Sequence, residues 1–284
     1  MSVERIPFIL SPPHEDEIHG DMYVATEASA CPLIIMVHGY TGFKDWGSLP
    51  AQCEWFAAHG MAAVAFNFSH NGIADDPMRI TDSERFARNT ISRELDELEC
   101  VVTAALEGKL PGADRYAANK IVLVGHSRGG AEAIIIGKEQ RAVRAVAAWG
   151  SIDHFDRWSA QQKSQWRADG RKIVHNSRLD MTLEMSVDYL HDLETNVARF
   201  NVGMNAATMR KPLLLVHGAQ DMTVLPKEAR QLYQASSPST TRLVIIPAAG
   251  HTFGSDHPFT TMPAALEGAL ETTLVFFQET LATR

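Results

Sequence analysis

The stretch Ile121-Val122-Leu123-Val124-Gly125-His126-Ser127-Arg128-Gly129 decides the fold, because an apolar run of strand length leads directly into Gly-x-Ser-x-Gly. Helix-type sequence follows, so Ser127 lies where a strand turns sharply into a helix. Such a turn is typical of a nucleophile elbow, which holds a strained serine above a sheet. Gly125 and Gly129 fit this interpretation, since a Cβ at either position would keep the strand and the helix apart. The motif predicts Ser127 as an exposed nucleophile, although alone it also fits an ordinary glycine-flanked turn.

Further apolar runs of strand length alternate with helix-length amphipathic stretches. The strand-like runs are 33–37, 62–68, 121–124, 143–149, 213–216 and 243–246. Helices are predicted at 48–59, after Ser83, from Pro226 and at 266–281. In the helix after Ser83, Glu94 and Glu97 are expected on the faces away from the core. Strands that are apolar on both faces and separated by helices predict an α/β fold, with a mostly parallel sheet covered by helices on both faces.

The alternation stops in the segment 152–205. Trp158, Trp166, Tyr189 and Phe200 lie there among many charges, and no strand-like run appears. We interpret the segment as a cap insertion after the sixth strand, with residues 1–151 and 206–284 forming the core. A long insertion is commonly a lid or a binding segment. The alternative is a helical excursion that only covers the surface.

The composition limits the classes of partner. The chain has 284 residues, 45% of them hydrophobic and 21% charged, and a net charge of −8. This balance is that of a soluble globular protein and offers no basic surface for nucleic acid. No signal-peptide-like start and no apolar run of membrane-spanning length is found, so a cytoplasmic location and no membrane span are expected. The oligomeric state stays open, with a homodimer as one alternative.

The cysteine and histidine patterns predict neither a metal nor a cofactor. Cys31, Cys53 and Cys100 are far apart in apolar surroundings, which predicts buried thiols and not a disulfide framework or a zinc site. The sequence contains no His-Glu-x-x-His, calcium loop, phosphate loop or dinucleotide fingerprint.

Two further residues at predicted strand ends complete the pattern of an acyl-transfer site. Asp221 follows the run at 213–216, and His251 follows the run at 243–246, so the order is Ser, Asp, His. His251 is predicted as the general base for Ser127 and Asp221 as the acid that orients its imidazole. Asp221 also fits a helix-capping role, because a helix is expected from Pro226.

Two neighbouring residues are alternatives for these roles. His257 competes with His251, but it precedes proline, where a structural turn is the more common role. Asp256 is the first alternative acid if Asp221 is not the partner of His251. Four further histidines, His38, His70, His126 and His217, are expected to be hydrogen-bonded structural residues.

An oxyanion hole needs two backbone N–H groups that point to one position. The residue after the nucleophile, Arg128, supplies the first. The loop His38-Gly39-Tyr40-Thr41-Gly42-Phe43 follows the run at 33–37, and its glycines allow it to fold back toward the elbow. Tyr40 is therefore predicted as the second donor.

Taken together, these residues resemble the α/β-hydrolase family over nearly the whole chain. The His-Gly-aromatic-Thr-Gly loop and the insertion are similar to the dienelactone-hydrolase-like and cinnamoyl (feruloyl) esterase groups. The resemblance implies ester hydrolysis through an acyl-enzyme, with Ser127, Asp221 and His251 as the triad and Tyr40 and Arg128 as oxyanion donors. Dienelactone hydrolases use a cysteine nucleophile, so Ser127 is a departure that does not support a lactone substrate.

The sequence therefore predicts a serine carboxylic ester hydrolase acting on a small-molecule ester with a small or medium acyl group. Aromatic residues of the insertion could line a pocket for an aromatic acyl group, or they could form the core of the cap. The same triad serves a serine peptidase or a thioesterase, and charges at Asp153, Asp156, Arg157 and Arg171 could bind the ends of a peptide. A non-catalytic small-molecule-binding protein is the alternative from another class.

Overall fold

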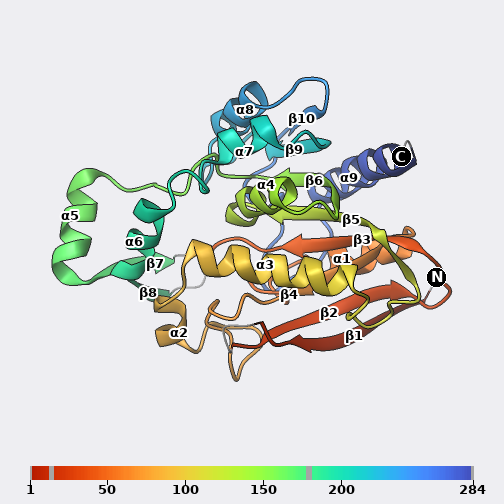
Figure 1. Ribbon diagram of the computed structural model, residues 1–284, viewed down its shortest axis with the longest axis horizontal. Coiled ribbons are helices and arrows are strands. Elements are labelled where there is room, and N and C mark those ends of the chain that lie inside the picture. The colour runs from red at the N-terminus through yellow and green to blue at the C-terminus, as the bar shows by residue number, and fades with distance from the viewer. Residues whose placement is uncertain (1, 13–15, 177–180, 283–284) are drawn as a thin grey trace.

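An eight-stranded sheet forms the centre of the computed structural model, which describes residues 2–12, 16–176 and 181–282 (Figure 1). Its strands lie in the order β1-β2-β4-β3-β5-β6-β9-β10. They are β1 (Val3–Leu10), β2 (Ile18–Ala25), β3 (Cys31–Val37), β4 (Ala62–Phe66), β5 (Tyr116–His126), β6 (Val143–Trp149), β9 (Leu213–Gly218) and β10 (Thr241–Ile246). Only β2 runs against its neighbours β1 and β4, while the other neighbouring pairs are parallel. The mostly parallel sheet predicted from the sequence is confirmed.

Helices cover both faces of the sheet, as predicted. They are α1 (Leu49–Ala58), α2 (Ser83–Ala87), α3 (Ile91–Leu106), α4 (Arg128–Glu139), α7 (Val202–Thr208), α8 (Pro226–Ala235) and α9 (Ala264–Ala282). Helices α1 and α9 pack on one face, and α3, α4, α7 and α8 pack on the other. Strand β3 shows why the apolar runs are continuous: Ile34 and Met36 face α1 and α9, whereas Ile35 faces α3 and α4.

Helix α3 corrects one prediction. It begins after Thr90, whose side chain caps the helix by accepting from the Arg93 N–H. Glu94 and Glu97 were expected to face away from the core, yet they are only 1% and 4% exposed. Burial is possible because each carboxylate has its own donors: Glu94 bonds to Arg128, and Glu97 accepts from Ser69.

The strands β1 and β2 are not among the apolar runs of the sequence. β1 is the edge strand, and its side chains alternate between partly buried and exposed, so it has no continuous apolar run. Because β1 and β2 come first along the chain, the strand at 143–149 is β6. The insertion therefore follows the sixth strand, as predicted.

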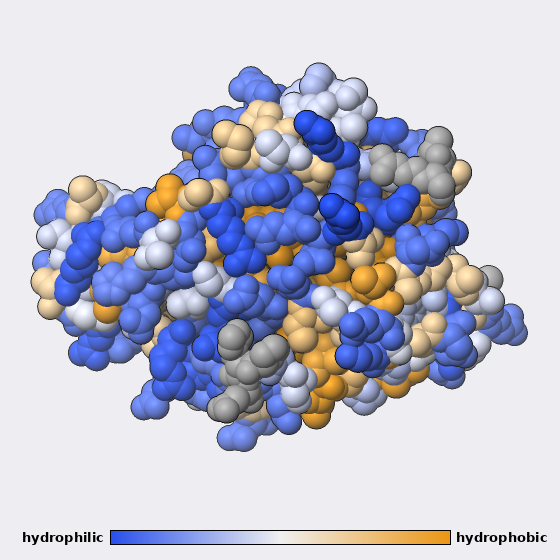
Figure 2. Space-filling view, in the orientation of Figure 1, coloured by the Kyte–Doolittle hydropathy of each residue, from blue (hydrophilic) through white to orange (hydrophobic). Residues whose placement is uncertain are grey.

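The insertion contains a two-stranded sheet as well as helices, which corrects the expectation that no strand occurs there. It consists of α5 (Ala160–Asp169), β7 (Arg171–Asn176), β8 (Met181–Ser186) and α6 (Val187–Thr195). These elements form a lobe to the left of the sheet in Figure 1. The lobe is covered mainly by hydrophilic residues on the face shown in Figure 2. Strand β7 has the sequence Arg-Lys-Ile-Val-His-Asn. Because most of these residues are polar, it does not form an apolar run and was not predicted as a strand.

The thiols are less uniformly buried than predicted. Cys53 is fully buried against α9, but Cys31 and Cys100 are only partly buried. Over the described residues, the structure contains no helix long and apolar enough to cross a membrane.

Candidate active site

Ser127 lies in the sharp turn between β5 and α4, as the motif predicts. Its φ is +57° and its ψ is −118°, a backbone conformation that residues with a Cβ rarely adopt. The turn is fixed by the Ser127 N–H, which donates to the carbonyl of Trp149 at the end of β6 (2.8 Å). The strained turn is therefore hydrogen-bonded to the neighbouring strand β6, at the carboxyl ends of the strands.

The glycines beside Ser127 are required by close packing. A Cβ on Gly125 would lie 2.0 Å from the carbonyl oxygen of Gly129, and a Cβ on Gly129 would lie 2.3 Å from that of Val37. A Cβ on Gly39 would lie 3.0 Å from the Cβ of Ser127. These three positions lack a side chain, and only for this reason can β5, α4 and the loop after β3 approach one another so closely.

Asp221 and His251 are brought together from two loops. Asp221 follows β9, His251 follows β10, and His251 Nδ1 lies 2.7 Å from Asp221 Oδ2. The side chains are 0% and 6% exposed. Because Nδ1 faces the carboxylate, Nε2 is the ring nitrogen left to face other groups. His251 and Ser127 line the same cavity.

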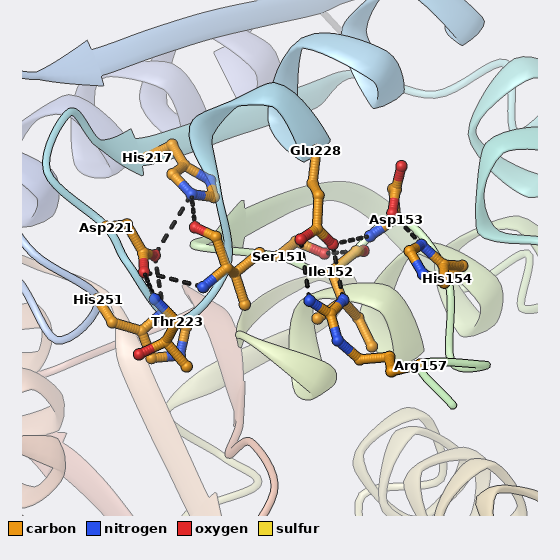
Figure 3. A network of polar contacts seen from close by, with 11 residues as sticks. Ser151, Ile152, Asp153, His154, Arg157, His217, Asp221, Thr223, Glu228 and His251 are labelled. Carbon is orange, nitrogen blue, oxygen red and sulfur yellow. Dashed lines mark hydrogen bonds and ion pairs between the residues drawn. The ribbon is translucent and has the colours of Figure 1, made fainter. Parts of the chain in front are cut away.

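The Asp221 carboxylate is held by more donors than the sequence indicated (Figure 3). Its Oδ1 accepts from the N–H groups of Thr223 and Val224 (both 2.9 Å), and His217 Nε2 lies 3.3 Å from Oδ2. Burial favours the neutral acid, but hydrogen bonds from His217 and His251 outweigh it and hold the pKa of Asp221 well below its usual range. His217 was expected to be structural only. Its position four residues before Asp221, at a strand end, was the signal for a contact.

His126 and His257 have structural contacts. His126 Nε2 lies 2.8 Å from the carbonyl oxygen of His251 and so supports the loop that carries it. The Gly47 N–H donates to His257 Nδ1 (2.9 Å), and Trp46 stacks on the ring, which places His257 outside the Asp221 pair. Asp256, the alternative acid, is exposed.

His38 and His70 are also buried. The Phe68 N–H donates to His38 Nε2 (3.4 Å), while Nδ1 lies 3.0 Å from the Gly39 carbonyl oxygen. Burial lowers the pKa of each imidazole to about 4, so both rings are neutral near pH 7.

The loop after β3 lies against the elbow and is tied to the insertion. Thr41 has a φ of +59°, and its hydroxyl donates to the Tyr40 carbonyl (2.6 Å). Asn176, at the end of β7, donates to the Thr41 hydroxyl (2.7 Å), and the Tyr40 hydroxyl donates to Met185 Sδ in β8 (3.3 Å). Within residues 2–12, 16–176 and 181–282, the N–H groups of Tyr40 and Arg128 have no hydrogen-bond acceptor.

The side chain of Arg128 points away from the elbow into a buried charge cluster. Its guanidinium bonds to Glu94, lies 3.5 Å from Glu132 Oε1, and covers the ring of Tyr40 at 4.9 Å. Burial, and then the nearby Glu94 carboxylate, raise the pKa of Glu132 well above its usual range. The cluster therefore anchors the first turn of α4 to α3 and to the loop that carries Tyr40.

A cavity of about 100 Å³ contains the candidate nucleophile and base. Ser127, His126, His251, Gly39 and Tyr40 form its wall at the ends of the strands. Among the described residues, Asn176 is the lining residue from the insertion. The aromatic side chains of the insertion pack on one another instead, with Trp158 and Trp166 ring centroids 5.1 Å apart. They form the core of the insertion.

A second polar cluster lies beyond Asp221, at the start of the insertion (Figure 3). Asp153, His154 and Glu228 come close enough together to hold a cation. However, Arg157 donates two hydrogen bonds to the buried Glu228 carboxylate (2.8 and 3.0 Å), so this carboxylate already has a cationic partner. The arrangement is that of an ion pair that closes the insertion onto α8.

Solved structures with this architecture include several hydrolases. The chain superposes on Est1E from Butyrivibrio proteoclasticus with bound ferulic acid (TM-score 0.70, 21% identity, 97% of this chain and 99% of that chain). It is also similar to the alpha/beta hydrolase GrgF from Penicillium sp. sh18 (TM-score 0.72, 17% identity, 99% and 100%). A dienelactone hydrolase from Anabaena variabilis gives a TM-score of 0.63 at 15% identity (98% and 99%).

Sequence comparison gives the family. A search of curated protein sequences found no significant match. The profile of the alpha/beta hydrolase family matches residues 34–267, which include the elbow, Asp221 and His251. The resemblance inferred from the motifs is thereby confirmed, and the chain belongs to the alpha/beta hydrolase family.

Proposed function

We propose that the protein is a serine carboxylic ester hydrolase that acts through an acyl-enzyme on esters with small acyl groups. The observation that carries the proposal is the buried 2.7 Å contact between Asp221 and His251, because His251 lines the same cavity as Ser127. Membership of a hydrolase family and the likeness to esterase folds support the reaction class.

In the first step, Ser127 Oγ attacks the ester carbonyl while His251 Nε2 takes its proton. Asp221 keeps the proton of neutral His251 on Nδ1 and stabilises the cationic ring that forms. Negative charge on the carbonyl oxygen is stabilised by the N–H groups of Tyr40 and Arg128, both without an acceptor among the described residues. The position of Arg128 at the first turn of α4 adds the positive end of the helix dipole.

The tetrahedral intermediate then collapses: the bond to the alcohol breaks, His251 gives its proton to the leaving alcohol, and the acyl-enzyme remains. Water then enters, gives a proton to His251 Nε2 and attacks the acyl carbon. The same oxyanion donors act again, and the proton returns to Ser127 when the acid is released.

The cavity favours a small acyl group over a large aromatic one. Its volume of about 100 Å³ is below the ~150 Å³ of an apolar cavity that holds benzene. Trp166 and Tyr189 stack on each other (6.0 Å) inside the insertion and do not line the cavity. These contacts give no support to an aromatic acyl pocket in the cap.

The charges of the insertion do not support peptide binding. Arg157 is paired with Glu228, Asp156 with Lys163, and Arg171 with Glu184. A site for the terminal amine or carboxylate of a peptide needs charges that are available to the ligand. An ester is therefore better supported as the substrate than a peptide.

The decisive experiment compares the wild type with Ser127→Ala on p-nitrophenyl esters of increasing acyl length, methyl ferulate and an aminoacyl anilide. We expect hydrolysis of the short p-nitrophenyl esters, and a loss of about 10⁴- to 10⁶-fold in kcat on substitution. A serine-directed phosphonate should add one label to the wild type and none to Ser127→Ala.

The other outcomes separate the alternatives. Turnover of the anilide alone would favour a peptidase, and turnover of acyl thioesters above oxygen esters would favour a thioesterase. Undiminished activity in Ser127→Ala would overturn the mechanism. A folded wild-type protein with neither turnover nor labelling would be a binding protein.

A further inference from the structure

The cavity beside Ser127 has a mainly apolar lining on the side of α1 and α9, with a small cluster of polar side chains in it. Met36, Val124 and Trp149 line it from the ends of β3, β5 and β6, and their side chains belong to the core under α1 and α9. Phe253 and Leu266 add to this apolar lining. The cavity therefore extends from the nucleophile toward the α1 and α9 face of the sheet, away from the insertion.

Three hydrogen-bonded side chains line the cavity on that side: Ser48, Gln52 and Ser255. Ser48 Oγ accepts from Gln52 Nε2 (2.8 Å) and from Ser255 Oγ (2.8 Å). Ser48 is 1% exposed and Ser255 is 5% exposed. Two donors occupy the oxygen of Ser48, and none of the described residues accepts its hydroxyl hydrogen. A buried donor without an acceptor is costly, so it marks a position for a ligand atom.

The conformation of Ser48 supports this interpretation. Ser48 is the N-cap residue of α1, a position at which serine normally caps the helix by accepting from a backbone N–H. Here the side chain makes no capping bond, and the first turn contains Pro50 instead. The hydroxyl hydrogen of Ser48 is therefore not used to cap the helix and is available to a ligand in the cavity.

We propose that this inner end of the cavity binds a hydroxyl group at the far end of the acyl chain, so that the preferred substrates are esters of short hydroxy acids. A hydroxyl both donates and accepts, which matches the Ser48 O–H donor and the amide oxygen of Gln52. A ligand carboxylate fits less well, because it has no hydrogen to donate to the amide oxygen of Gln52. The inference rests on the proposed function, since Ser127 must attack the ester carbonyl.

The volume favours a short acyl chain. Scaled from the ~150 Å³ cavity that holds the six carbons of benzene, about 100 Å³ accommodates about four non-hydrogen atoms. Beyond the carbonyl, a 4-hydroxybutanoyl group has three carbons and one oxygen. A pentanoyl group has the same shape with a methyl in place of the hydroxyl.

The test compares ethyl 4-hydroxybutanoate with ethyl pentanoate by titrating the acid released, with an enzyme-free blank. We expect the wild-type kcat/KM to be about 10-fold higher for the hydroxy ester. Ser48→Ala and Gln52→Leu should each lower this ratio toward 1, because each removes one hydrogen-bonding group. Ser255→Ala should lower it less, since Ser255 only orients Ser48.

A surface variant controls for unrelated effects of substitution. Ser239→Ala changes an exposed serine before β10 and should leave the ratio at the wild-type value. Equal or better turnover of ethyl pentanoate by the wild type would overturn the hydroxyl site while leaving the esterase intact, and so would a ratio unchanged in both Ser48→Ala and Gln52→Leu. If no ester at all is hydrolysed, p-nitrophenyl acetate included, the proposed function fails and this inference fails with it.

Discussion

Two buried carboxylates of the elbow region have pKa values that are shifted in opposite directions. Asp221 and Glu132 are 1% and 0% exposed. Asp221 is held by two imidazoles and two backbone N–H groups, and its pKa is depressed. Glu132 has no hydrogen-bond partner among the described residues, and its pKa is raised. At similar burial, the donors around Asp221 and the Glu94 carboxylate beside Glu132 decide which of the two carries a charge.

The difference suits the role that we propose for each region. A charged Asp221 can orient His251 and stabilise the ring when it becomes cationic. Glu132 shares Arg128 with Glu94, so a neutral Glu132 leaves one positive and one negative charge in the cluster. In the proposed mechanism the charge of Asp221 assists catalysis, whereas a neutral Glu132 limits the charge in the cluster that anchors α4.

The largest expected effect is on catalysis. Asp221→Asn keeps the shape of the side chain but removes the charge and favours the wrong tautomer of His251, so kcat should fall by about 10⁴-fold. Circular dichroism should show an intact fold. Hydrolysis of p-nitrophenyl acetate measures the loss.

A matched control tests the assignment of the acid. Asp256→Asn changes an exposed aspartate in the same loop as His251 and should leave kcat at the wild-type value. If Asp256→Asn is impaired and Asp221→Asn is not, the acid has been assigned to the wrong loop.

A smaller effect is expected on stability. Arg128→Met keeps the backbone N–H but leaves Glu94 and Glu132 without their cation, so the free energy of unfolding should fall by about 3–5 kcal/mol. Urea denaturation measures this change. Adding Glu94→Gln to Arg128→Met removes the stranded charge and should recover most of the loss; a double variant no more stable than Arg128→Met would contradict the cluster as described.

The smallest effect is a pH dependence of opposite sign at the two carboxylates. The raised pKa of Glu132 gives a contribution to stability that is present below the usual Glu pKa and is lost as the pH rises. The free energy of unfolding of the wild type, relative to Glu132→Gln, should therefore decrease from pH 5 to pH 8, by at most about 1.4 kcal/mol per unit.

The same measurement on Asp221 should give the reverse slope. Its depressed pKa gives a contribution that is present above the usual Asp pKa and is lost as the pH falls. Relative to Asp221→Asn, the wild type should gain stability from pH 3 to pH 5. Equal slopes for the two pairs would show that the donors around Asp221 do not set its charge.

The sequence predicted the parallel core well because its strands are buried on both faces. Strand β6 was predicted at its observed bounds, and the elbow was recognised because glycine spacing and strand–helix order are local properties. The edge strand β1 and the hairpin β7–β8 were missed because half-exposed strands need no continuous apolar run.

The candidate site was predictable only as far as it follows strand ends. Ser127, Asp221 and His251 each follow a strand, so their convergence could be inferred from the parallel sheet. Ser48 and Ser255 are 207 positions apart in irregular segments, and only the fold brings their hydroxyls to 2.8 Å. The buried positions of Glu94 and Glu97 were likewise hidden, because a charged residue on a helix is normally exposed.

The strained turn at Ser127 lowers the stability of the fold while it holds the proposed nucleophile in place. Its φ of +57° suits glycine, and a residue with a Cβ at such a position costs about 1–2 kcal/mol. A population of variants selected only for resistance to heat would therefore gain by exchanging Ser127 for glycine, and would lose the proposed nucleophile in the same step. Any evolution experiment on this chain that is meant to raise thermostability must screen for turnover in every round.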